Sequence, residues 1–454
     1  ANVGRPLLGR DSFQEVDIAG IVMPVTKYSF IVKNIEDLAD TLRRAFYIAK
    51  SGRPGPVLVD ITKDVTGATC DYEYQAPEEI VRQSDTIREE DMERAVEMIR
   101  KSRKPFIFVG GGAVLSNASD ELRAFAHKIQ APAGESLMGK GAFDGCDELY
   151  TGMVGMHGTK TSNFGITEAD LLIVVGARFS DRGTGNASKF ARNAKILQLD
   201  IDPAEINKNI KVDASVIGDV KVILRKLNAR LDPINHDEWI AHIERMKDMY
   251  PLRYDKKTLT GPFIVQTINE VTQGDAVIVT EVGQHQMWTM QFYPFEKPHT
   301  LLTSGGLGTM GYGFGAAIGG CIAARGRRTV LFTGDGSFGM NLNEMATAVS
   351  QELPITIVIF DNDVLGMVRQ WQTIFYDCHY SQTILDRKTD FPALAKAFGA
   401  DGYAVYTMED LKKALDVADK SQGPVLIDCH IDMDEKVLPM IPPGRSIKDM
   451  IVEG

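Results

Sequence analysis

The sequence has little cysteine. Five cysteines are scattered over 454 residues, and no two of them form a CxxC pair. An odd set of dispersed cysteines fits reduced thiols in a cytoplasmic protein. The eight histidines are equally dispersed and show no HExxH or other metal-ligand spacing. We therefore expect no zinc site.

Long apolar runs and an excess of basic residues are missing as well. The chain contains no stretch of about 18 consecutive apolar residues, so we expect no membrane-spanning helix. The formal net charge is −11, and no basic block offsets it. This balance argues against nucleic acid and against anionic membrane surfaces as partners.

The chain also lacks an initiating methionine and a signal peptide, because it opens with Ala1-Asn2-Val3-Gly4. We expect from this opening that the sequence begins part-way through a longer protein.

What is present predicts an α/β protein. Residues 36–50 place apolar side chains on one helical stripe, and residues 56–61 form the apolar run of a buried strand. Repetition of this order along the chain predicts three doubly wound parallel-sheet domains, the first of them incomplete. The predicted segments are part of a first domain at 1–66, a linker at 67–88, a central domain at 89–228, a second linker at 229–260, a third domain at 261–432 and a tail at 433–454.

The strongest motif is Gly334-Asp335-Gly336-Ser337, followed by Asp361-Asn362-Asp363. The interval between Asp335 and Asn362 holds one helix and one strand, so both residues should end neighbouring parallel strands. A carboxylate and an amide oxygen beside a backbone carbonyl suit Mg²⁺. The glycines allow close approach of a phosphate, and a helix expected to begin near Met340 would present N–H groups to it. A lone GDG would more often be a simple turn, but the second acid–amide pair favours a metal–diphosphate site.

The segment from Gly334 to Asn362 resembles the fingerprint of thiamine-diphosphate enzymes. The resemblance implies that Mg²⁺ is held by the side chains of Asp335 and Asn362 and by the carbonyl of Val364. Many relatives have Asn-Asn where this chain has Asp361-Asn362, and the ligand position is kept.

Longer motifs resemble the large, catalytic subunit of acetolactate synthase. They are Asp11–Asp17, Gly52–Pro56, Ser304–Gly311, Leu365–Gln372 and Val437–Pro442. This resemblance implies decarboxylation of pyruvate on thiamine diphosphate and condensation of the two-carbon fragment with a second 2-ketoacid, pyruvate or 2-ketobutyrate. That reaction is the first common step of branched-chain amino-acid biosynthesis. The resemblance also implies a homodimer or tetramer with a small regulatory subunit.

The same resemblance assigns the cofactor contacts. For thiamine diphosphate they are Gln284, His285, Gly308, Met310, Gly334, Gly336, Ser337, Leu365, Gly366 and Met367, and Arg53 is a further cofactor contact. The implied catalytic and substrate-contacting residues are Gln14, Lys63, Arg182, Met310, Met367 and Trp371.

Three of these residues have specific implied roles, and only the motifs in which they lie support those roles. Met310 props thiamine in its bent form, Trp371 selects the second ketoacid by size, and Arg182 holds the carboxylate of that acid. Taken singly, Met310 and Trp371 would more often be core residues, and Arg182 a surface arginine. Ser180 departs from the usual Phe-Asp-Asp-Arg around Arg182.

A flavin site is also implied. Residues 306–311 fit GxGxxG, but the strand before them is weak and arginines occupy the place of the expected acid, so we reject an NAD site there. The segment Arg178–Arg182 instead resembles biosynthetic acetolactate synthases that contain FAD. The implied FAD contacts are Gly110, Gly111, Gly112, Ser136, Leu137, Met138, Gly155, Met156, His157, Gly176, Ala177, Arg178, Asp200, Ile201, Gly218, Asp219 and Val220.

In the resembled family a glutamate upstream of Phe13-Gln14 activates the cofactor, and we expect that glutamate to lie outside this sequence. Neither Glu15 nor Glu36 is expected to replace it. The 454 residues alone are therefore expected to bind the cofactor weakly. Two alternatives remain open: another thiamine-diphosphate carboligase or decarboxylase, and a non-catalytic chain that binds only flavin or a partner subunit.

Overall fold

The computed structural model describes residues 2–79, 86–324, 326–386 and 388–452. Residues 80–85 of the predicted first linker and 453–454 of the predicted tail lie outside this part. The chain forms two compact units, one reaching to Thr86 and including Ile201–Pro203, the other comprising the remainder. Among the described residues, no helix combines the length and the apolar character needed to cross a membrane.

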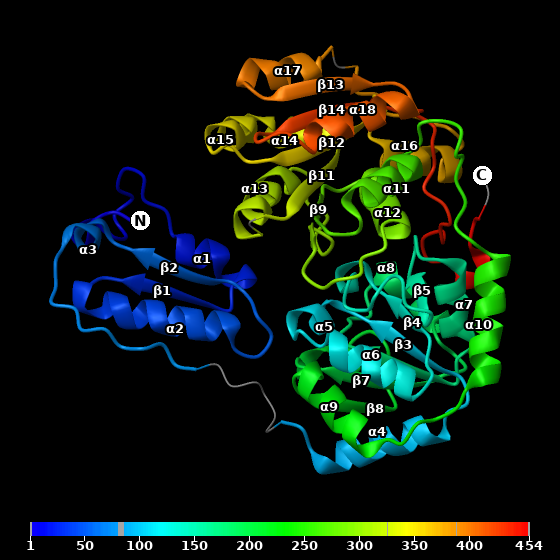
Figure 1. Ribbon diagram of the computed structural model, residues 1–454. Coiled ribbons are helices and arrows are strands. Elements are labelled where there is room, and N and C mark those ends of the chain that lie inside the picture. Colours follow the sequence, from blue (N-terminus) through cyan, green and yellow to red (C-terminus); the bar gives the residue numbers. More distant parts are fainter. Residues whose placement is uncertain (1, 80–85, 325, 387, 453–454) are drawn as a thin grey trace. The chain divides into compact units, whose positions relative to one another are not determined.

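The first unit contains a two-stranded parallel sheet (Figure 1). Strand β1 (Tyr28–Val32) pairs with β2 (Val57–Ile61), and helix α2 (Leu38–Lys50) packs against both strands. Short helices α1 (Ile18–Val22) and α3 (Lys63–Gly67) flank them. The sequence predicted α2 and β2 but not β1, which has several polar or partly exposed positions.

The second unit contains two six-stranded sheets, which we call the central sheet and the C-terminal sheet. Neighbouring strands run parallel in both. This arrangement confirms the predicted α/β fold with parallel sheets.

The central sheet has the strand order β5-β4-β3-β6-β7-β8. Its strands are β3 (Pro105–Val109), β4 (Ala133–Glu135), β5 (Tyr150–Met153), β6 (Leu171–Val175), β7 (Lys195–Asp200) and β8 (Ala214–Ile217). Its helices are α4 (Glu89–Lys101), α5 (Gly111–Leu115), α6 (Ser119–Lys128), α7 (Lys160–Glu168), α8 (Asp181–Thr184), α9 (Val220–Arg230) and α10 (Asp237–Met249).

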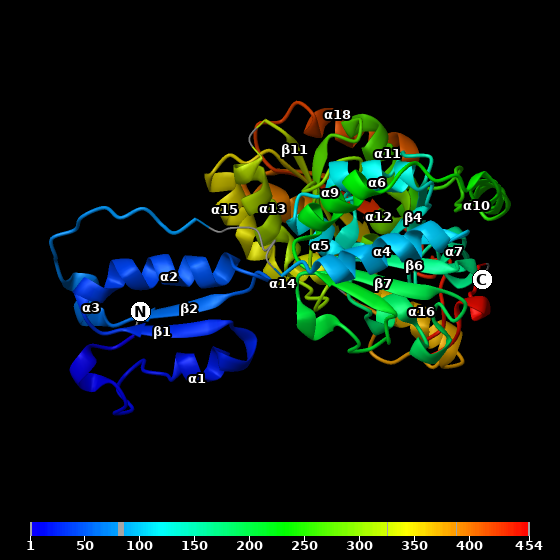
Figure 2. The same ribbon diagram turned by 90° about the horizontal axis from the view of Figure 1, so that it is seen from below.

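Separate apolar cores cover the two faces of the central sheet. Helices α4, α6 and α9 bury one face, and Figures 1 and 2 show α6 and α9 side by side. Helix α7 covers the other face together with Ile441 and Ile447 from the predicted tail. The tail is therefore part of the folded core, although its sequence has little periodicity.

The C-terminal sheet has the strand order β10-β9-β11-β12-β14-β13. Its strands are β9 (Ala276–Thr280), β10 (Leu301–Thr303), β11 (Arg328–Gly334), β12 (Ile355–Asp361), β13 (Asp401–Val405) and β14 (Val425–His430). Its helices are α11 (Gly261–Thr272), α12 (Gln284–Phe292), α13 (Gly313–Ala323), α14 (Asp335–Asn341), α15 (Met345–Ser350), α16 (Gly366–Phe375), α17 (Phe391–Phe398) and α18 (Met408–Ala418).

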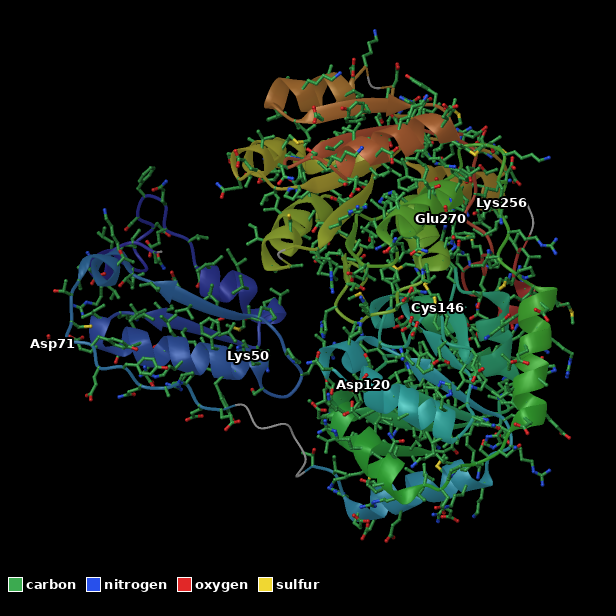
Figure 3. The ribbon with its side chains drawn as sticks, viewed as in Figure 1. Lys50, Asp71, Asp120, Cys146, Lys256 and Glu270 are labelled. Atoms are coloured by element: carbon green, nitrogen blue, oxygen red, sulfur yellow. The ribbon has the colours of Figure 1, made fainter. Side chains whose placement is uncertain are left out.

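Helices cover both faces of this sheet as well. Helices α11, α12 and α18 pack on one face, while α13, α15 and α17 pack on the other. Figure 3 adds the side chains, with Asp120 marking α6 and Glu270 marking α11.

Two local expectations differ from the structure. The predicted second linker, 229–260, contains helix α10, whose buried Trp239, Ile243 and Met246 pack at helical spacing within a largely polar segment. The helix expected to begin near Met340 begins instead at Asp335, so Gly334 ends β11 and the rest of the GDGS motif lies in the first turn of α14. Glycine has a low helix propensity, so the glycines of that motif did not indicate a helix.

Candidate functional site

The candidate site lies where the strand order of the C-terminal sheet reverses. The chain passes from β9 outward to β10 on one side, and from β11 outward to β12 on the other. The carboxyl ends of β9 and β11 therefore border a switch point, the usual ligand-binding position in open α/β sheets. Gln284 and His285 follow β9, and Asp335 follows β11.

Asp335 and Asn362 lie at the ends of paired parallel strands, as their spacing predicted. Strands β11 and β12 pair with Gly334 opposite Phe360. Both side chains are buried, and the carboxylates of Asp335, Asp361 and Asp363 place ligand atoms within 4.8 Å of one another. Burial and the charge of Asp363 raise the pKa of Asp361. Crowded carboxylates beside an amide oxygen form a donor set that fits a divalent cation.

Two polar side chains at the start of α12 complete the buried edge of the site. Gln284 Oε1 accepts a hydrogen bond from Asn362 Nδ2 at 3.2 Å, and its Nε2 donates to Gln370 Oε1 at 3.1 Å. Burial lowers the pKa of His285 to about 3, so its ring is neutral. His285 Nε2 is buried without a hydrogen-bond partner among the described residues. Such a group fits a ligand atom that would satisfy it.

The glycines at the edge of the site pack closely against neighbouring side chains. A Cβ on Gly366 would overlap Gln284 Oε1 and lie 2.8 Å from Asn362 Nδ2. A Cβ on Gly336 would lie 3.0 Å from Leu365 and 3.1 Å from Leu385. A larger residue at either position would therefore press on the side chains that line the site.

Glu281 holds the loop that carries Gly308 and Met310. Its buried carboxylate accepts hydrogen bonds from the N–H groups of Gly311, at 2.8 Å, and Gly313, at 2.7 Å. Burial raises the pKa of Glu281, while the backbone N–H groups act in the opposite direction. Sequence reasoning missed Glu281, although it directly follows a predicted strand.

Trp371 and Arg182 come together from two segments far apart in the sequence. The Arg182 guanidinium carbon lies 5.9 Å from the centre of the Trp371 ring. Both side chains are at least partly accessible, and Met367 lies one helical turn before Trp371 on α16. A cation over an aromatic face can orient a carboxylate against an apolar wall.

The predicted flavin residues cluster at the switch point of the central sheet, between β3 and β6. Gly112 N–H donates to the Gly176 carbonyl at 2.9 Å, and a Cβ on Gly110 would overlap that carbonyl and Ala177. Tight packing of two backbone turns therefore explains these glycines without a ligand. Arg178 follows them with an exposed side chain.

The other predicted flavin residues fall into three groups. Ser136, Leu137 and Met138 follow β4, and a Cβ on Gly305 would overlap Leu137, so this turn lies against the loop before Met310. Gly155, Met156 and His157 follow β5, and Met156 N–H donates to the Arg182 carbonyl at 2.8 Å.

The third group lies at the ends of β7 and β8. It comprises Asp200, Gly218, Asp219 and Val220. Asp219 caps α9 by accepting a hydrogen bond from Lys221 N–H at 2.9 Å. Ile201 belongs to the first unit by its contacts. The cap gives Asp219 a local structural role.

Four predicted site residues lie in the first unit, which is described by itself. Gln14 is exposed with a positive φ of 61°, and Lys63 begins α3 with an exposed side chain. Arg53 and Ile201 are the other two, whereas Gly111 belongs to the second unit. Glu15 accepts hydrogen bonds from the N–H groups of its own turn, which lower its pKa. This local role accounts for the Glu15 carboxylate without a part in activating the cofactor.

Sequence reasoning missed the tail residues that line the site. Gln370 Nε2 donates to the Val437 carbonyl at 3.1 Å, and Gln284 Nε2 donates to the Glu435 carbonyl at 2.7 Å. Burial raises the pKa of Glu435 to about 7. The Val437–Pro442 motif was the available signal, but nothing in its spacing predicted which partners it would meet.

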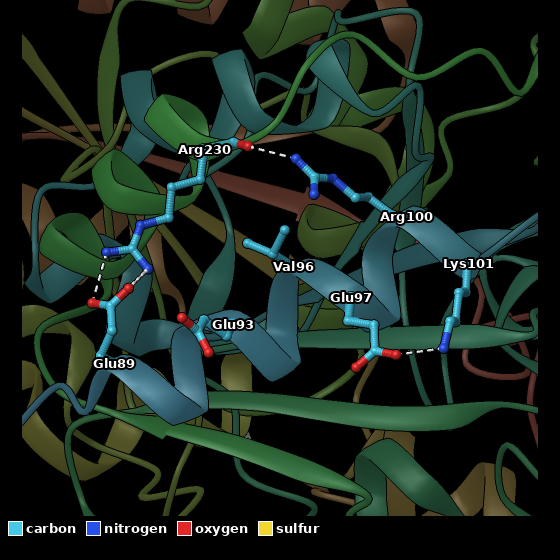
Figure 4. Close-up of a pocket in the computed structure, with 7 residues that line it drawn as sticks. All are labelled: Glu89, Glu93, Val96, Glu97, Arg100, Lys101 and Arg230. Carbon is cyan, nitrogen blue, oxygen red and sulfur yellow. Dashed lines mark hydrogen bonds and ion pairs between the residues drawn. The ribbon is translucent and has the colours of Figure 1, made fainter.

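A surface groove of about 690 Å³ lies on α4, away from these residues. Figure 4 shows four of its charged side chains in ion pairs, Arg230 with Glu89 and Lys101 with Glu97. The groove therefore offers no second candidate of comparable chemistry.

Comparison with known proteins identifies the family to which this geometry belongs. Residues 281–429 match the C-terminal TPP binding domain of thiamine pyrophosphate enzymes, and residues 92–227 match the central domain of those enzymes. The acetolactate synthase isozyme 2 large subunit of Escherichia coli (strain K12) is 41% identical over 451 residues, which cover 99% of this chain and 81% of that protein. The chain belongs to the acetolactate synthase large-subunit family.

Relatives from other lineages agree. The acetolactate synthase large subunit of Porphyra purpurea is 40% identical over 99% of this chain and 78% of its own length. That of Corynebacterium glutamicum is 41% identical over 99% of this chain and 74% of its own length. The resemblance inferred from the motifs is therefore confirmed, and the chain is a member of a thiamine-diphosphate enzyme family.

Proposed function

We propose that this chain is the catalytic subunit of an acetolactate synthase that joins pyruvate to pyruvate or 2-ketobutyrate. The buried polar residues at the C-terminal switch point, within the match to the TPP binding domain, carry the proposal. Thiamine diphosphate, when bound, would supply the carbon nucleophile that this reaction needs.

The protein side chains bind and orient that cofactor in this proposal. Asp335, Asn362 and the Val364 carbonyl hold Mg²⁺, whose oxygen preference matches this donor set. His285, with its buried Nε2 free of a hydrogen bond among the described residues, faces the diphosphate together with Gln284. The backbone at Gly334, Gly336, Ser337, Leu365 and Gly366 is proposed to surround the same group.

Substrate selection is assigned to the Arg182–Trp371 pair. Arg182 binds the carboxylate of the second ketoacid, and Trp371 sets the space for its alkyl group. Met310 supports the bent cofactor, and Met367 borders the same pocket. Gln14 and Lys63 are proposed substrate contacts, and Arg53 is a proposed cofactor contact.

FAD is proposed as a second cofactor, at the switch point of the central sheet. The exposed Arg178 beside the glycine turns offers a partner for a pyrophosphate. The contact between the Gly305 loop and Leu137 supports placing this cofactor next to thiamine diphosphate. Binding, orientation and exclusion of water are the roles of these residues; no redox step is assigned to them.

The remaining proposals concern assembly and context. The large-subunit names of the relatives support a separate small subunit, to which we assign a regulatory role. A homodimer or tetramer is part of the same proposal. We place the enzyme in the cytoplasm and in branched-chain amino-acid synthesis. The domain limits 1–66, 89–228 and 261–432, with linkers at 67–88 and 229–260, remain our proposal.

Acetolactate formation tests the proposed function. Purified protein is assayed with pyruvate, Mg²⁺, thiamine diphosphate and FAD, with and without an N-terminal extension that supplies the activating glutamate. We expect acetolactate from the extended protein. Thiamine-diphosphate binding without acetolactate in either form would favour a different carboligase or decarboxylase.

A further inference from the structure

Three side chains outside the proposed cofactor contacts gather on one face of the C-terminal sheet. Strands β12 and β14 pair with Asp361 opposite His430 and Ile359 opposite Asp428. Because side chains alternate along a strand, Asp361, Asp428 and His430 share a face. That is the face covered by α13, α15 and α17.

The ligand atoms of these three residues converge. They lie within 4.8 Å of one another. His430 Nε2 is 3.5 Å from Asp428 Oδ2, and His430 Nδ1 is 3.9 Å from Asp361 Oδ2. The imidazole therefore stands between two carboxylates, at separations that an intervening ion would bridge.

Asp428 adds an independent observation. Only 3% of the residue is accessible to solvent, so Asp428 is 97% buried. Its Oδ1 has no hydrogen-bond partner within the described part of the chain. A buried carboxylate oxygen with no donor is costly, so a positive ligand at this position would stabilise the fold.

The surrounding charge has the sign that a cation needs. The charged groups acting most strongly on Asp428 are the carboxylates of Asp361, Asp335 and Asp390. His430 supplies the nearby nitrogen, and its ring stacks on Tyr406 with centroids 4.5 Å apart and planes inclined by 3°. The stacking fixes the orientation of the imidazole, as a ligand requires.

We propose that Asp361, Asp428 and His430 form a second divalent-cation site, suited to a transition-metal ion such as Mn²⁺ or Zn²⁺. Two carboxylates and one imidazole favour these ions over Mg²⁺ or Ca²⁺, which prefer oxygen ligands alone. His430 is partly accessible, so an ion and its water ligands can reach the site from solvent. Nothing in the proposed acetolactate reaction requires this ion.

Asp361 connects the second site to the proposed Mg²⁺ site. Its Oδ1 accepts a hydrogen bond from Asp363 N–H at 3.2 Å, while its Oδ2 faces His430. Asp361 also belongs to the carboxylate group that includes Asp335. The rival arrangement is a proton shared between Asp361 and Asp428, in which no additional ion binds.

Mn²⁺ binding distinguishes the two arrangements. Asp335→Asn serves as the background, because it removes the proposed Mg²⁺ ligand and leaves all three residues of the second site in place. Electron paramagnetic resonance of free Mn²⁺, in the full chain without added nucleotide or thiamine, gives the number bound. We expect one Mn²⁺ per chain in this background, and binding at least about tenfold weaker after His430→Phe is added.

The substituted phenylalanine keeps a ring against Tyr406 but offers no nitrogen. Asp428→Asn should give the same loss, and Asp416→Asn, which removes an exposed carboxylate on α18, should leave Mn²⁺ binding unchanged. Equal Mn²⁺ binding with and without His430→Phe would overturn the proposal. If Asp428→Asn fails to fold, the His430→Phe result alone decides. Failure of acetolactate formation would leave this result untouched, because it is measured without thiamine diphosphate.

Discussion

The central and C-terminal sheets are both six-stranded and parallel, but they differ in strand order and in the residues at their switch points. Between β3 and β6 the two turns pack backbone against backbone, with Gly110 and Gly112 against Gly176. Between β9 and β11 the corresponding edge carries buried polar groups, including Asp335 and His285. Close-packed glycines thus stand at the switch point of one sheet, and buried polar side chains stand at the switch point of the other.

The difference shows that a glycine turn at a strand end is ambiguous. In the central sheet the glycines are required by the fold whether or not FAD binds. In the C-terminal sheet Gly366 borders the side chains of Gln284 and Asn362, so its lack of a Cβ protects a polar arrangement. Substitutions at the two edges should therefore fail in different ways.

Asp335→Asn should have the largest effect. Replacing the proposed carboxylate ligand should lower acetolactate formation at least about 100-fold and weaken Mg²⁺-dependent cofactor binding. Activity across a Mg²⁺ titration, with the exposed Asp416→Asn as control, measures this. Wild-type activity in Asp335→Asn would contradict the assignment of the Mg²⁺ ion to this edge of the sheet.

Gly366→Ala should impair cofactor binding while the fold persists. The new Cβ would overlap the Gln284 amide, which is a side chain and can move at the cost of its hydrogen bonds. We expect thiamine-diphosphate affinity to fall by about tenfold. Titration of the cofactor by intrinsic fluorescence measures the change. Gly423→Ala, where a Cβ meets nothing within 4 Å, is the matched control.

Trp371→Leu should change selectivity more than rate. Loss of the ring next to Arg182 alters the wall against the second ketoacid, and such pocket changes shift preference by about tenfold. Competition between pyruvate and 2-ketobutyrate, with both products quantified, gives the ratio. The product ratio of Trp371→Phe should lie between those of the wild type and Trp371→Leu. An unchanged product ratio in Trp371→Leu would contradict the assignment.

Gly110→Ala should act on stability instead of cofactor binding at the C-terminal sheet. Its Cβ would overlap the Gly176 carbonyl, and backbone cannot yield as a side chain does. We expect a loss of about 1–3 kcal/mol in the free energy of unfolding. Denaturant unfolding measures it, with Gly423→Ala again as control. Wild-type stability in Gly110→Ala would show that the turns at Gly110 and Gly176 can move apart without cost.

Glu435→Gln should have the smallest effect, seen in pH dependence. Burial raises the pKa of Glu435 to about 7 from its ordinary 4.5. The folded state therefore holds the proton more tightly, and stability is lost as pH rises between these values. Removing the charge should abolish about 1–2 kcal/mol of that decline, a value discounted for partial exposure. Unfolding at pH 5 and pH 8, with exposed Glu244→Gln as control, would reveal an unchanged slope if the assignment is wrong.

The elements with strong apolar runs were predictable from the sequence. Strands β3, β6 and β9 are of this kind, because each is a short, fully buried apolar run that ends in turn residues. Strand β13 was missed, since Asp401 and Gly402 interrupt its apolar pattern. Helix α14 was placed too late, because its first residues include Asp335 and two glycines.

The partners of each site residue were less predictable than the strand ends. The spacing of Asp335 and Asn362 implied neighbouring strands, and β11 and β12 are paired. No spacing rule could join Arg182 to Trp371, or Gln370 to Val437, because those contacts depend on tertiary packing across long intervals. His430 carried no signal at all, since a lone histidine is usually structural.

One measurement tests the central claim most directly: acetolactate formed from pyruvate by the extended protein and by its Asp335→Asn variant, side by side, with Mg²⁺, thiamine diphosphate and FAD. The account predicts acetolactate from the first and almost none from the second, with both proteins folded. Equal product from both, or bound cofactor without any acetolactate from the first, would contradict it.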